Sequence, residues 1–309
     1  LAFELSVPAD LNERAAGLTS RKMPLQATVT LQDDDLIRFA VDVDNQVLSH
    51  RLCVHFATDI MASVSCADQL FGAITRPVEL KDSLKVWEAE QWHEKPIAIE
   101  PMQSYVNLHD GSHGFTFHTN GVREYEIVGD NFDTVAVTLF RSFSHMGKTD
   151  LLYRPGRASG ESVVATPDAQ ILGQLSFAFS WRIYSGRFDD AMHARVSKTL
   201  LTTFPVYQDS DFLNGRLRFC LSDEVRDYPE AFSLLTLPAT SGDALVSAVK
   251  CAEKDTGYII RLYNPNLADS VALPQLKGAR TVMLDEQTPM PERQQLRPGD
   301  VQTLYVEME

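Results

Sequence analysis

Apolar and polar side chains alternate along most of this chain with a period of two. In QATVTLQDDDLIRFAVDVDN (26–45), two alternating runs flank an acidic segment. The same pattern recurs in RLCVHFAT (51–58), GFTFHTNG (114–121), TVAVTLFRS (134–142) and LGQLSFAFSWRIYSG (172–186). Alternation places the apolar side chains on one face of an extended strand. We therefore predict a strand in each of these segments, and a strand, a turn and a second strand in the first.

Turn signals separate the alternating runs at short intervals. Asp110-Gly111 and Asn120-Gly121 are dipeptides of tight hairpins, and GDNFD (129–133) follows the short run YEIV (125–128). Many short strands with frequent turns are typical of an antiparallel sandwich rather than of βαβ units. The sequence thus predicts an all-β fold that begins with a large antiparallel β-sandwich.

One segment, FDDAMHARVSKTLLTTF (188–204), departs from the alternating pattern. Ala191 and Leu201 fall near helical spacing, and Asp189 or Asp190 can cap the N-terminus of a helix. We predict the main helix of the chain here, and we expect it to end the large domain.

A second set of alternating runs follows the helix. They are GRLRFCLS (215–222), FSLLTLP (232–238), GYIIRLYNPN (257–266) and DVQTLYVEM (300–308), with ALVSAVKCAEKD (244–255) as either a short helix or a strand and turn. About a hundred residues is the size of an immunoglobulin-like sandwich. We predict two domains, a large β-sandwich over residues 1–205 and a small one over residues 206–309.

Composition and charge narrow the class of partner. The chain has 309 residues, a hydrophobic fraction of 44% and a charged fraction of 23%, as in a globular protein with a full core. Its formal net charge of -14 disfavours nucleic acid and anionic membrane surfaces, which require basic patches. No run approaches the ~20 apolar residues of a membrane span. We expect neither nucleic acid nor a membrane as a partner.

The cysteines and the first residue bear on the compartment. The four cysteines show no C-x2-C spacing, and Cys53 and Cys220 lie in apolar runs, where a reduced, buried thiol is the ordinary state. The sequence begins with Leu1 and shows no signal-peptide pattern. We therefore expect a piece of a longer, cytoplasmic protein.

A metal site is the first candidate for chemistry. Four histidines fall within a short stretch: His93, His109, His113 and His118. The spacing H-x3-H-x4-H aligns histidines on one face only in a helix. Gly111 and Gly114 oppose a helix, so strand and loop positions are favoured over a metal site.

Paired carboxylates are the second candidate. Glycoside hydrolysis needs two, roughly 5 to 9 Å apart. Glu100, Asp110, Glu124 and Glu126 lie on or between neighbouring predicted strands. However, Glu100 precedes a proline, which favours extended backbone, and Asp110 belongs to a turn. Structural roles are favoured for these acids.

Nucleophile and phosphate motifs do not occur. The sequence contains no G-x-S-x-G elbow, and its glycine-rich stretch RPGRASGES (154–162) lacks the lysine of a phosphate loop. This basic stretch could contact an anionic ligand, but a plain surface loop is favoured.

Several motifs together resemble a known family. They are VDVDNQVLSHRLCVHFAT (41–58), LFGAITRPVE (70–79), IEPMQSYVNLHDGSHGFTFHTNGVREYEI (99–127), TVAVTLFRS (134–142), RPG (154–156), TPDAQILG (166–173) and GYIIRLYNPN (257–266). In this order they resemble the C-terminal β region of glycoside hydrolase family 38 α-mannosidases, most of all the bacterial branch with mannosylglycerate hydrolases. The resemblance implies a mutarotase-like supersandwich followed by a small immunoglobulin-like sandwich.

The resemblance also implies a chemistry that this chain does not carry. The family hydrolyses α-mannosides with retention, using an aspartate nucleophile, a second carboxylic acid and a zinc ion that holds the sugar hydroxyls. These groups belong to an N-terminal domain whose zinc motif has a histidine two residues before an aspartate. None of the eight histidines here shows that spacing. We expect no catalytic residue and no metal ligand in this chain, and zinc in the missing catalytic domain.

The resemblance leaves one functional contribution for this chain, a supporting role at the substrate pocket. In the family, the large β-domain packs on the catalytic domain and lends side chains to the rim of the sugar pocket. Arg123, Glu124 and Tyr125 are our candidates, because a cation, a carboxylate and an aromatic ring suit sugar hydroxyls or an anionic aglycone. The expected partners are the protein's own N-terminal catalytic domain, a mannoside and other subunits of a homo-oligomer.

Two other functions stay open at this point. The chain could be a free-standing carbohydrate-binding module whose exposed aromatics, Trp87, Trp92 or Tyr105, form a platform for sugar stacking. It could instead be a complete enzyme with a mutarotase-like site, for which Glu100 and His118 are the pair that could converge in a cleft.

Overall fold

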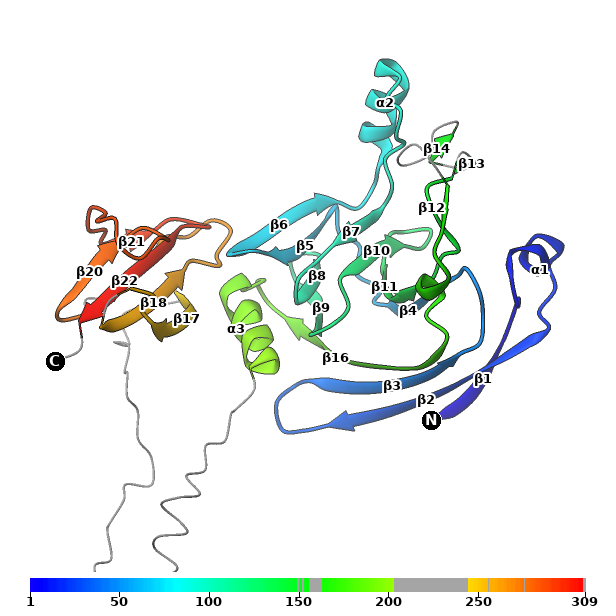
Figure 1. Cartoon of the computed structure of the whole chain (residues 1–309), viewed down its shortest axis with the longest axis horizontal. Coiled ribbons are helices and arrows are strands. Elements are labelled where there is room, and N and C mark those ends of the chain that lie inside the picture. Colours follow the sequence, from blue (N-terminus) through cyan, green and yellow to red (C-terminus); the bar gives the residue numbers. More distant parts are fainter. Residues whose placement is uncertain are drawn as a thin grey trace, which may run out of the picture.

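The chain folds into two groups of antiparallel sheets with one helix between them (Figure 1). This computed structural model describes residues 1–148, 150–151, 153–155, 163–202, 244–254, 256–274 and 276–307. Within them, every pairing of strands is antiparallel. The predicted all-β, antiparallel fold is confirmed.

The larger group is built on an eight-stranded sheet with the order β1-β2-β3-β16-β9-β8-β5-β6. The strands are β1 (Ala2–Val7), β2 (Arg21–Leu31), β3 (Ile37–Asn45), β16 (Gly173–Ser185), β9 (His113–Thr119), β8 (Tyr105–His109), β5 (Val64–Gln69) and β6 (Gly72–Pro77). β2 and β3 form the hairpin predicted over residues 26–45. The long alternating run predicted over 172–186 becomes β16, which lies between β3 and β9.

A four-stranded sheet packs on the inner face of the eight-stranded one. Its order is β4 (Arg51–Ala57), β11 (Thr134–Arg141), β10 (Glu124–Val128) and β7 (Ile99–Pro101). Phe56 of β4 contacts the rings of Phe117 and Phe179 from the larger sheet, at centroid distances of 5.7 and 6.1 Å. Each such buried side chain contributes about 1.5–3 kcal/mol to folding. These interlocked aromatics are the centre of the main core.

Helix α3 (Asp190–Leu201) covers part of the outer face of the eight-stranded sheet, over β8 and β9. Asp189 caps it, because its carboxylate accepts a hydrogen bond of 2.8 Å from the backbone N–H of Met192. The predicted helix is thus confirmed, with Asp189 as the cap. The buried side of α3 carries His193 and Ser197, which face the sheet.

The second group is a smaller set of sheets. Four strands pair in the order β17 (Leu245–Cys251), β18 (Gly257–Tyr263), β22 (Val301–Glu307) and β20 (Ala279–Val282), and β19 (Val271–Ala272) pairs with β21 (Gln295–Leu296). Leu262, Leu296 and Leu304 belong to its own core. Residues 245–251 form a strand, so the strand alternative predicted for 244–255 is correct and the helix alternative is wrong.

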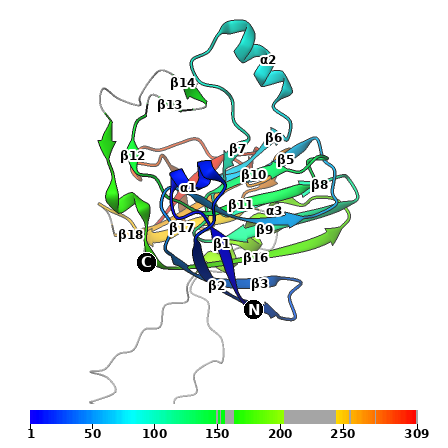
Figure 2. The same ribbon diagram turned by 90° about the vertical axis from the view of Figure 1, so that its right-hand side faces the viewer.

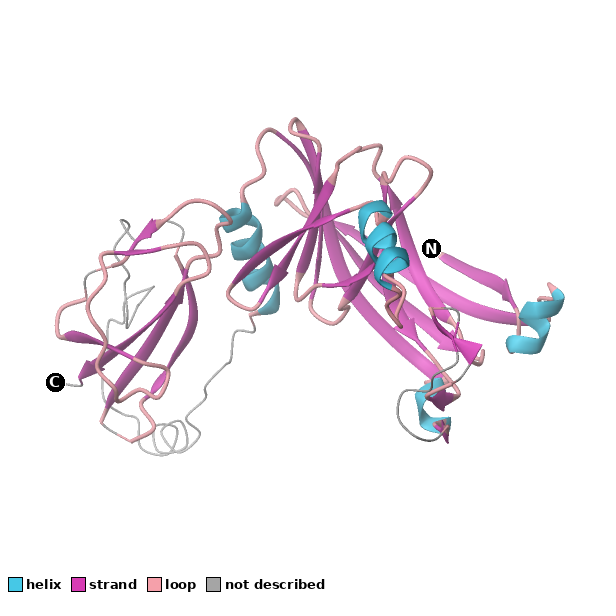
Figure 3. Ribbon diagram, turned by 90° about the horizontal axis from the view of Figure 1, so that it is seen from above, coloured by secondary structure: helices cyan, strands magenta, loops and turns pink. Residues whose placement is uncertain are grey.

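The smaller group docks on α3 and on the nearby edge of the large sheet (Figure 3). Tyr105 of β8 and Ala194 of α3 share one buried cluster with Leu245 and Tyr263 of the small domain. Because apolar side chains from both groups are buried together, the two are held at a shared interface rather than by a linker alone.

Part of the predicted organisation falls outside the described residues. The strands predicted at 215–222 and 232–238, Cys220, and the domain border between 205 and 206 all lie in the undescribed stretch 203–243. These stay predictions.

The predicted hairpin at Asn120-Gly121 is wrong. Neither residue has a positive φ, which a two-residue hairpin turn of this type requires. The segment instead carries the chain from β9 of the larger sheet to β10 of the smaller one. A local dipeptide could not reveal that crossover, because the choice of partner strand is made by long-range packing. The turns at Asp110-Gly111 and at 129–133 do join paired strands, as predicted.

Several short elements project from the large sandwich (Figures 1 and 2). They are α1 (Leu11–Ala16), α2 (Lys81–Glu90), β12 (His145–Met146), β13 (Asp150–Leu151), β14 (Arg154–Pro155) and β15 (Val164–Ala165). The 3-10 turn η1 (Pro167–Gln170) instead lies against the sandwich, where Gln170 is buried and bonds to Asn45 and Ser49. We made no prediction for helix α2, which buries none of its residues.

Asn264 is expected to be a key polar residue of the small domain. It is fully buried, its amide donates to the carbonyl oxygens of Asp269 (2.7 Å) and Leu296 (3.1 Å), and its oxygen accepts from the N–H of Asn266 (3.0 Å). Asn264→Ala leaves these groups without partners, which should lower the free energy of unfolding by about 2 kcal/mol. Urea unfolding followed by circular dichroism measures this. The exposed control Asn131→Ala should change stability by less than about 0.5 kcal/mol, and an equal loss in both variants would contradict the assignment.

Candidate functional site

The three predicted rim residues do not point the same way. Arg123 is exposed, and its guanidinium donates to the carbonyl oxygen of Asn120 at 3.3 Å. Glu124 and Tyr125 are consecutive residues of strand β10, so their side chains point to opposite faces of the four-stranded sheet. The sequence placed them together, but the pleat separates them.

Glu124 lies in a network of charges on the outer face of that sheet. Its carboxylate accepts from Arg141 and from the hydroxyl of Thr138, both at 2.7 Å, and lies 3.9 Å from Arg51. Arg51 is also paired with Glu126 at 2.8 Å. All three contacts are made by one oxygen of the Glu124 carboxylate, Oε1, in the cross-strand arrangement expected of structural charges.

Tyr125 belongs to the core, with 1% of its surface exposed. Its hydroxyl lies 2.9 Å from that of Ser65 and 3.4 Å from the guanidinium of Arg76. Burial raises the pKa of this phenol. In this chain Tyr125 is therefore shielded from any ligand, and the rim role of Arg123 and Glu124 stays a prediction.

The pair proposed for a mutarotase-like site is not brought together. Glu100 of β7 is paired with Arg76 at 3.0 Å, whereas His118 of β9 is held by the hydroxyl of Ser197 on α3 at 2.7 Å. Burial raises the pKa of Glu100, and Arg76 opposes that shift. With separate partners on separate sheets, these two groups do not form an acid–base pair.

Two histidines lie buried beneath α3. The rings of His118 and His193 have 1% and 0% of their surface exposed and stack with centroids 5.9 Å apart. Tyr105 and Tyr184 contact His193 at centroid distances of 6.3 and 4.9 Å. Nε2 of His118 and Nδ1 of His193 have no hydrogen-bond partner among the described residues. We call His118 and His193 the buried histidine pair.

Burial keeps this pair neutral. It lowers the pKa of His118 to about 3, assisted by the charge of Arg182, and it lowers the pKa of His193 to about 3, assisted by His118. Neither ring is therefore charged near pH 7. A closely packed glycine permits this arrangement, since a Cβ at Gly114 would lie 2.1 Å from the ring of Tyr184.

The other histidines of the predicted cluster spread apart. His109 stacks on Tyr184, and its Nε2 lies 2.8 Å from the carbonyl oxygen of Gly186. His93 and His113 are exposed. Over the described part of the chain, no three His, Cys, Asp or Glu side chains are grouped so that they could hold a metal ion. These residues do not fit a zinc site.

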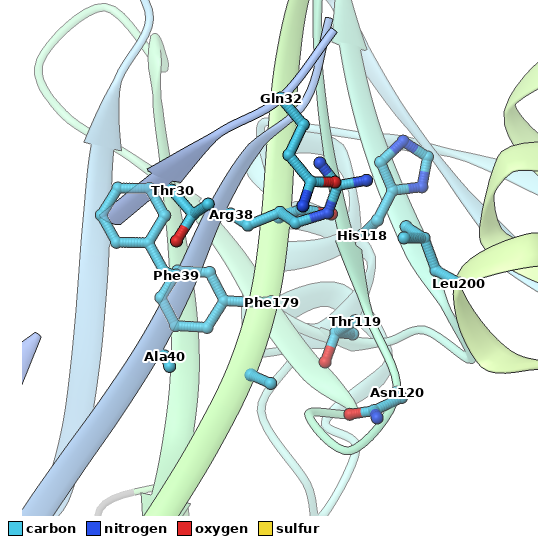
Figure 4. Close-up of a pocket in the computed structure, with 12 residues that line it drawn as sticks. Thr30, Gln32, Arg38, Phe39, Ala40, His118, Thr119, Asn120, Phe179 and Leu200 are labelled. Carbon is cyan, nitrogen blue, oxygen red and sulfur yellow. The ribbon is translucent and has the colours of Figure 1, made fainter. Parts of the chain in front are cut away.

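A cavity of about 330 Å³ opens beside the buried histidine pair (Figure 4). It lies on the outer face of the eight-stranded sheet, between the β2–β3 hairpin, strands β9 and β16, and the last turn of α3. Its lining residues are Thr30, Gln32, Arg38, Phe39, Ala40, His118, Thr119, Asn120, Ala178, Phe179, Ser180 and Leu200. We call it the hairpin cavity.

Charges at the hairpin cavity are balanced. Arg38 reaches toward its centre (Figure 4), and its guanidinium forms a two-point ion pair with Asp34, with Nη1–Oδ1 at 2.8 Å. This pairing raises the pKa of Arg38 and lowers that of Asp34. His118 is neutral, and the residues that line the cavity include no acid. The cavity therefore favours a neutral occupant.

The proposed aromatic platform is not formed. Tyr105 is buried, with 1% of its surface exposed. Trp87 and Trp92 lie at the end of α2, where the indole N–H of Trp87 donates to the carbonyl oxygen of Trp92 at 2.8 Å and that of Trp92 donates to Glu90. Tyr105 is thus buried in β8, apart from the two tryptophans, and cannot join them in one platform for a sugar.

Sequence reasoning missed most of the hairpin cavity. Gln32, Arg38 and Leu200 carry no motif, and they come from segments far apart in the chain. His193 was part of the predicted helix, but the pattern did not show that it meets His118. No signal in the sequence analysis pointed to this meeting of the two histidines.

Among the described residues, no helix is long and apolar enough to cross a membrane. Cys53, Cys66 and Cys251 are free thiols, and burial raises the pKa of Cys66 to about 12. At neutral pH this buried thiol is protonated and therefore a poor nucleophile.

Comparison with known proteins gives the chain a family context. Residues 15–169 match the model described as the glycosyl hydrolases family 38 C-terminal domain. The chain is 26% identical over 293 residues to a protein of Halalkalibacterium halodurans with the provisional name mannosylglycerate hydrolase; the match covers 89% of this chain and 27% of that protein. The chain thus spans about a quarter of the length of this curated relative.

Solved structures show the same fold. A family 38 glycosyl hydrolase from Enterococcus faecalis superposes with a TM-score of 0.71 at 19% identity, covering 99% of this chain and 34% of that one. An α-mannosidase from Enterococcus faecalis V583 superposes with a TM-score of 0.72 at 20% identity, covering 99% and 33%. At these identities, the likeness concerns the fold.

Proposed function

Because this chain belongs to family 38 of the glycosyl hydrolases and carries its C-terminal domain, we propose that it is the non-catalytic β-part of a retaining, zinc-dependent α-mannosidase. Its role is to support the catalytic domain and to complete the substrate pocket. The parent protein hydrolyses α-mannosides, mannosylglycerate among them, as the name of the similar Halalkalibacterium protein suggests. The aspartate nucleophile, the acid and the zinc ligands belong to the catalytic domain, and the cytoplasm is its proposed compartment.

The observation that carries this proposal is the projecting segment of α2 and Trp92, whose apolar side chains stay exposed in the described part of the chain. Helix α2 buries no residue, and Val86 and Trp92 are 41% and 48% exposed. A helix of ten residues is marginal in water by itself, so its apolar side chains need a surface to pack on. The backbone N–H of Lys95 donates to the carbonyl oxygen of Tyr153 at 2.9 Å, which ties the segment that follows this helix to the turn between β13 and β14.

Exposed apolar side chains also occur in the neighbouring segments, at β12, at β15 and in the turn between β13 and β14. Met146, Tyr153, Val163 and Val164 are all exposed, at 48% or more. Exposed apolar side chains in neighbouring projections are typical of a surface that contacts another protein part. About three quarters of the curated relative lies outside the matched part, so the rest of the same polypeptide is the partner of the right kind.

Disruption of this surface is expected to inactivate the parent enzyme. Val86→Glu places a carboxylate in the buried contact, which costs well over the ~1.4 kcal/mol of a tenfold change. Hydrolysis of p-nitrophenyl α-mannoside by the full-length protein with zinc should fall at least about tenfold. The matched control is Val249→Glu, on an exposed position of β17 in the small domain, which should retain activity.

The same assay tests whether catalysis and zinc binding belong to the catalytic domain rather than to this chain. The 309-residue chain alone should show no turnover, and EDTA should abolish the activity of the parent protein while leaving the melting temperature of this chain unchanged. Turnover by the isolated chain, or full activity in Val86→Glu, would overturn the proposal.

A further inference from the structure

The hairpin cavity contains hydrogen-bonding groups that the protein itself does not use. Within the described residues, the side-chain amides of Gln32 and Asn120 and the hydroxyl of Thr30 make no hydrogen bond. An amide offers both a donor and an acceptor, and a hydroxyl offers the same pair of functions. Gln32 and Asn120 lie at opposite ends of the cavity (Figure 4), so they can hold two separated polar groups of one ligand.

The wall between these groups is apolar and open. Ala40 and Ala178 present small side chains from neighbouring strands, and Leu200 adds an aliphatic side chain from α3. Ligand sites commonly combine a mainly apolar lining with a few placed polar groups. This combination suits a ring that has C–H groups on one face and hydroxyls at its edge.

Charge narrows the class of ligand. The guanidinium of Arg38 is already engaged by Asp34, and His118 is neutral, so neither supplies a free cation for an anionic ligand. The lining residues include no carboxylate for a cationic ligand. A neutral ligand with several hydroxyls remains as the chemical class that the cavity recognises.

The volume of the hairpin cavity limits the size of the ligand. A volume of about 330 Å³ lies at the small end of ligand sites, which span about 300–1,000 Å³. We propose that the hairpin cavity binds one neutral pyranose unit, with Gln32 and Asn120 holding ring hydroxyls at its two ends. Since every residue of this site belongs to the described chain, the inference does not depend on the proposed role in an α-mannosidase.

Saturation-transfer NMR on the 309-residue chain tests this site, with methyl α-D-mannopyranoside as the probe. We expect signal transfer to the sugar and a dissociation constant in the millimolar range, as for a ligand of this size. Gln32→Ala and Asn120→Ala should each weaken binding about fivefold, the effect of losing one neutral hydrogen bond. Glucuronate, an anionic sugar acid, should bind more weakly than the neutral probe.

Two further variants make the test independent of folding. Ala178→Phe fills the cavity from an exposed position and should abolish binding, while circular dichroism stays unchanged. Asn12→Ala removes an exposed amide on α1, away from the cavity, and should leave binding intact. No signal transfer from the natural chain, equal binding by Ala178→Phe, or equal losses in Asn12→Ala and Asn120→Ala would each overturn the proposal. Turnover of nitrophenyl α-mannoside by the parent protein is a separate readout and is unaffected by these results.

Discussion

Lowering the pH from 7 to 5 is expected to destabilise the large domain by about 2 kcal/mol for each member of the buried histidine pair. Burial lowers the pKa of His118 and of His193 to about 3, whereas an unfolded histidine titrates near its ordinary pKa of about 6.5. Between these values the unfolded chain binds more protons than the folded one. Stability is therefore fully present above about pH 6.5 and falls as the pH decreases through that window.

In the described part of the chain, no acidic group near the buried histidine pair compensates the positive charge that protonation would create. Arg182 of β16 and His109 of β8 add positive potential, and the other rings beside the pair belong to the neutral side chains of Tyr105, Tyr184 and Phe188. The nearest hydrogen bond is to the hydroxyl of Ser197 on α3. Protonation of either ring thus places an uncompensated charge beneath the helix, and α3 should separate from the sheet first.

Urea unfolding at pH 7 and pH 5 measures the effect. His118→Gln/His193→Gln should lose stability at pH 7 but show a dependence on pH that is smaller by about 4 kcal/mol over this range. His55→Gln, at an exposed position of β4, is the matched control and should keep the natural dependence. If the double variant and the natural chain lose equal stability on acidification, the histidines are not responsible.

Asp68→Ala is expected to lower the free energy of unfolding by about 4 kcal/mol, because one carboxylate organises a whole turn. Its Oδ1 accepts from the backbone N–H groups of Gln103 (3.0 Å), Ser104 (2.6 Å) and Tyr105 (3.0 Å), and its Oδ2 accepts from the hydroxyl of Ser104 (2.5 Å). Hydrogen bonds to a charged acceptor are each worth about 1.5–3 kcal/mol. Without it, the N–H groups of Ser104 and Tyr105 at the start of β8 lose this acceptor, whereas the N–H of Gln103 keeps the backbone carbonyl oxygen of Asp68 at 3.2 Å.

Thermal and urea unfolding of three proteins would test this assignment. Asp68→Asn keeps one acceptor oxygen and should recover part of the loss, while Asp82→Ala, on the exposed side of α2, should change stability by less than about 0.5 kcal/mol. A loss below about 1 kcal/mol in Asp68→Ala would show that the turn is held by other contacts. Because Tyr105 follows directly and packs against the small domain, the contact between the two domains should weaken as well.

The local pattern was enough to predict most of the strands. Alternation in 51–58, 134–142, 172–186 and 257–266 correctly gave β4, β11, β16 and β18, because a period of two is a property of the extended backbone itself. The capped helix at 188–204 followed from equally local chemistry at Asp189. The family resemblance, carried by motifs in order along the chain, was confirmed by the match over residues 15–169.

Predictions that several residues share one surface, or that two strands pair with each other, were less accurate. Arg123, Glu124 and Tyr125 are neighbours in sequence, yet the pleat buries Tyr125 and leaves Glu124 in a network of charges. Asn120-Gly121 carries a hairpin signal, yet the chain crosses there to the other sheet. The separation of Glu124 from Tyr125 follows from the alternation of faces along a strand. The crossover at Asn120-Gly121 instead depends on which distant strand β10 pairs with, and the neighbouring residues in sequence do not contain that information.

By itself, the sequence determined the strands, the main helix, the acidic character and the family of this protein, since each is set by residue type and short-range spacing. Only the tertiary structure brought His118 to Ser197 across 79 residues, gathered Gln32, Asn120 and Leu200 around one cavity, and left α2 without a covering surface. The physical reason is that burial and contact depend on which faces of distant elements pack together. That choice is made by the summed packing of the whole domain and not by any segment alone.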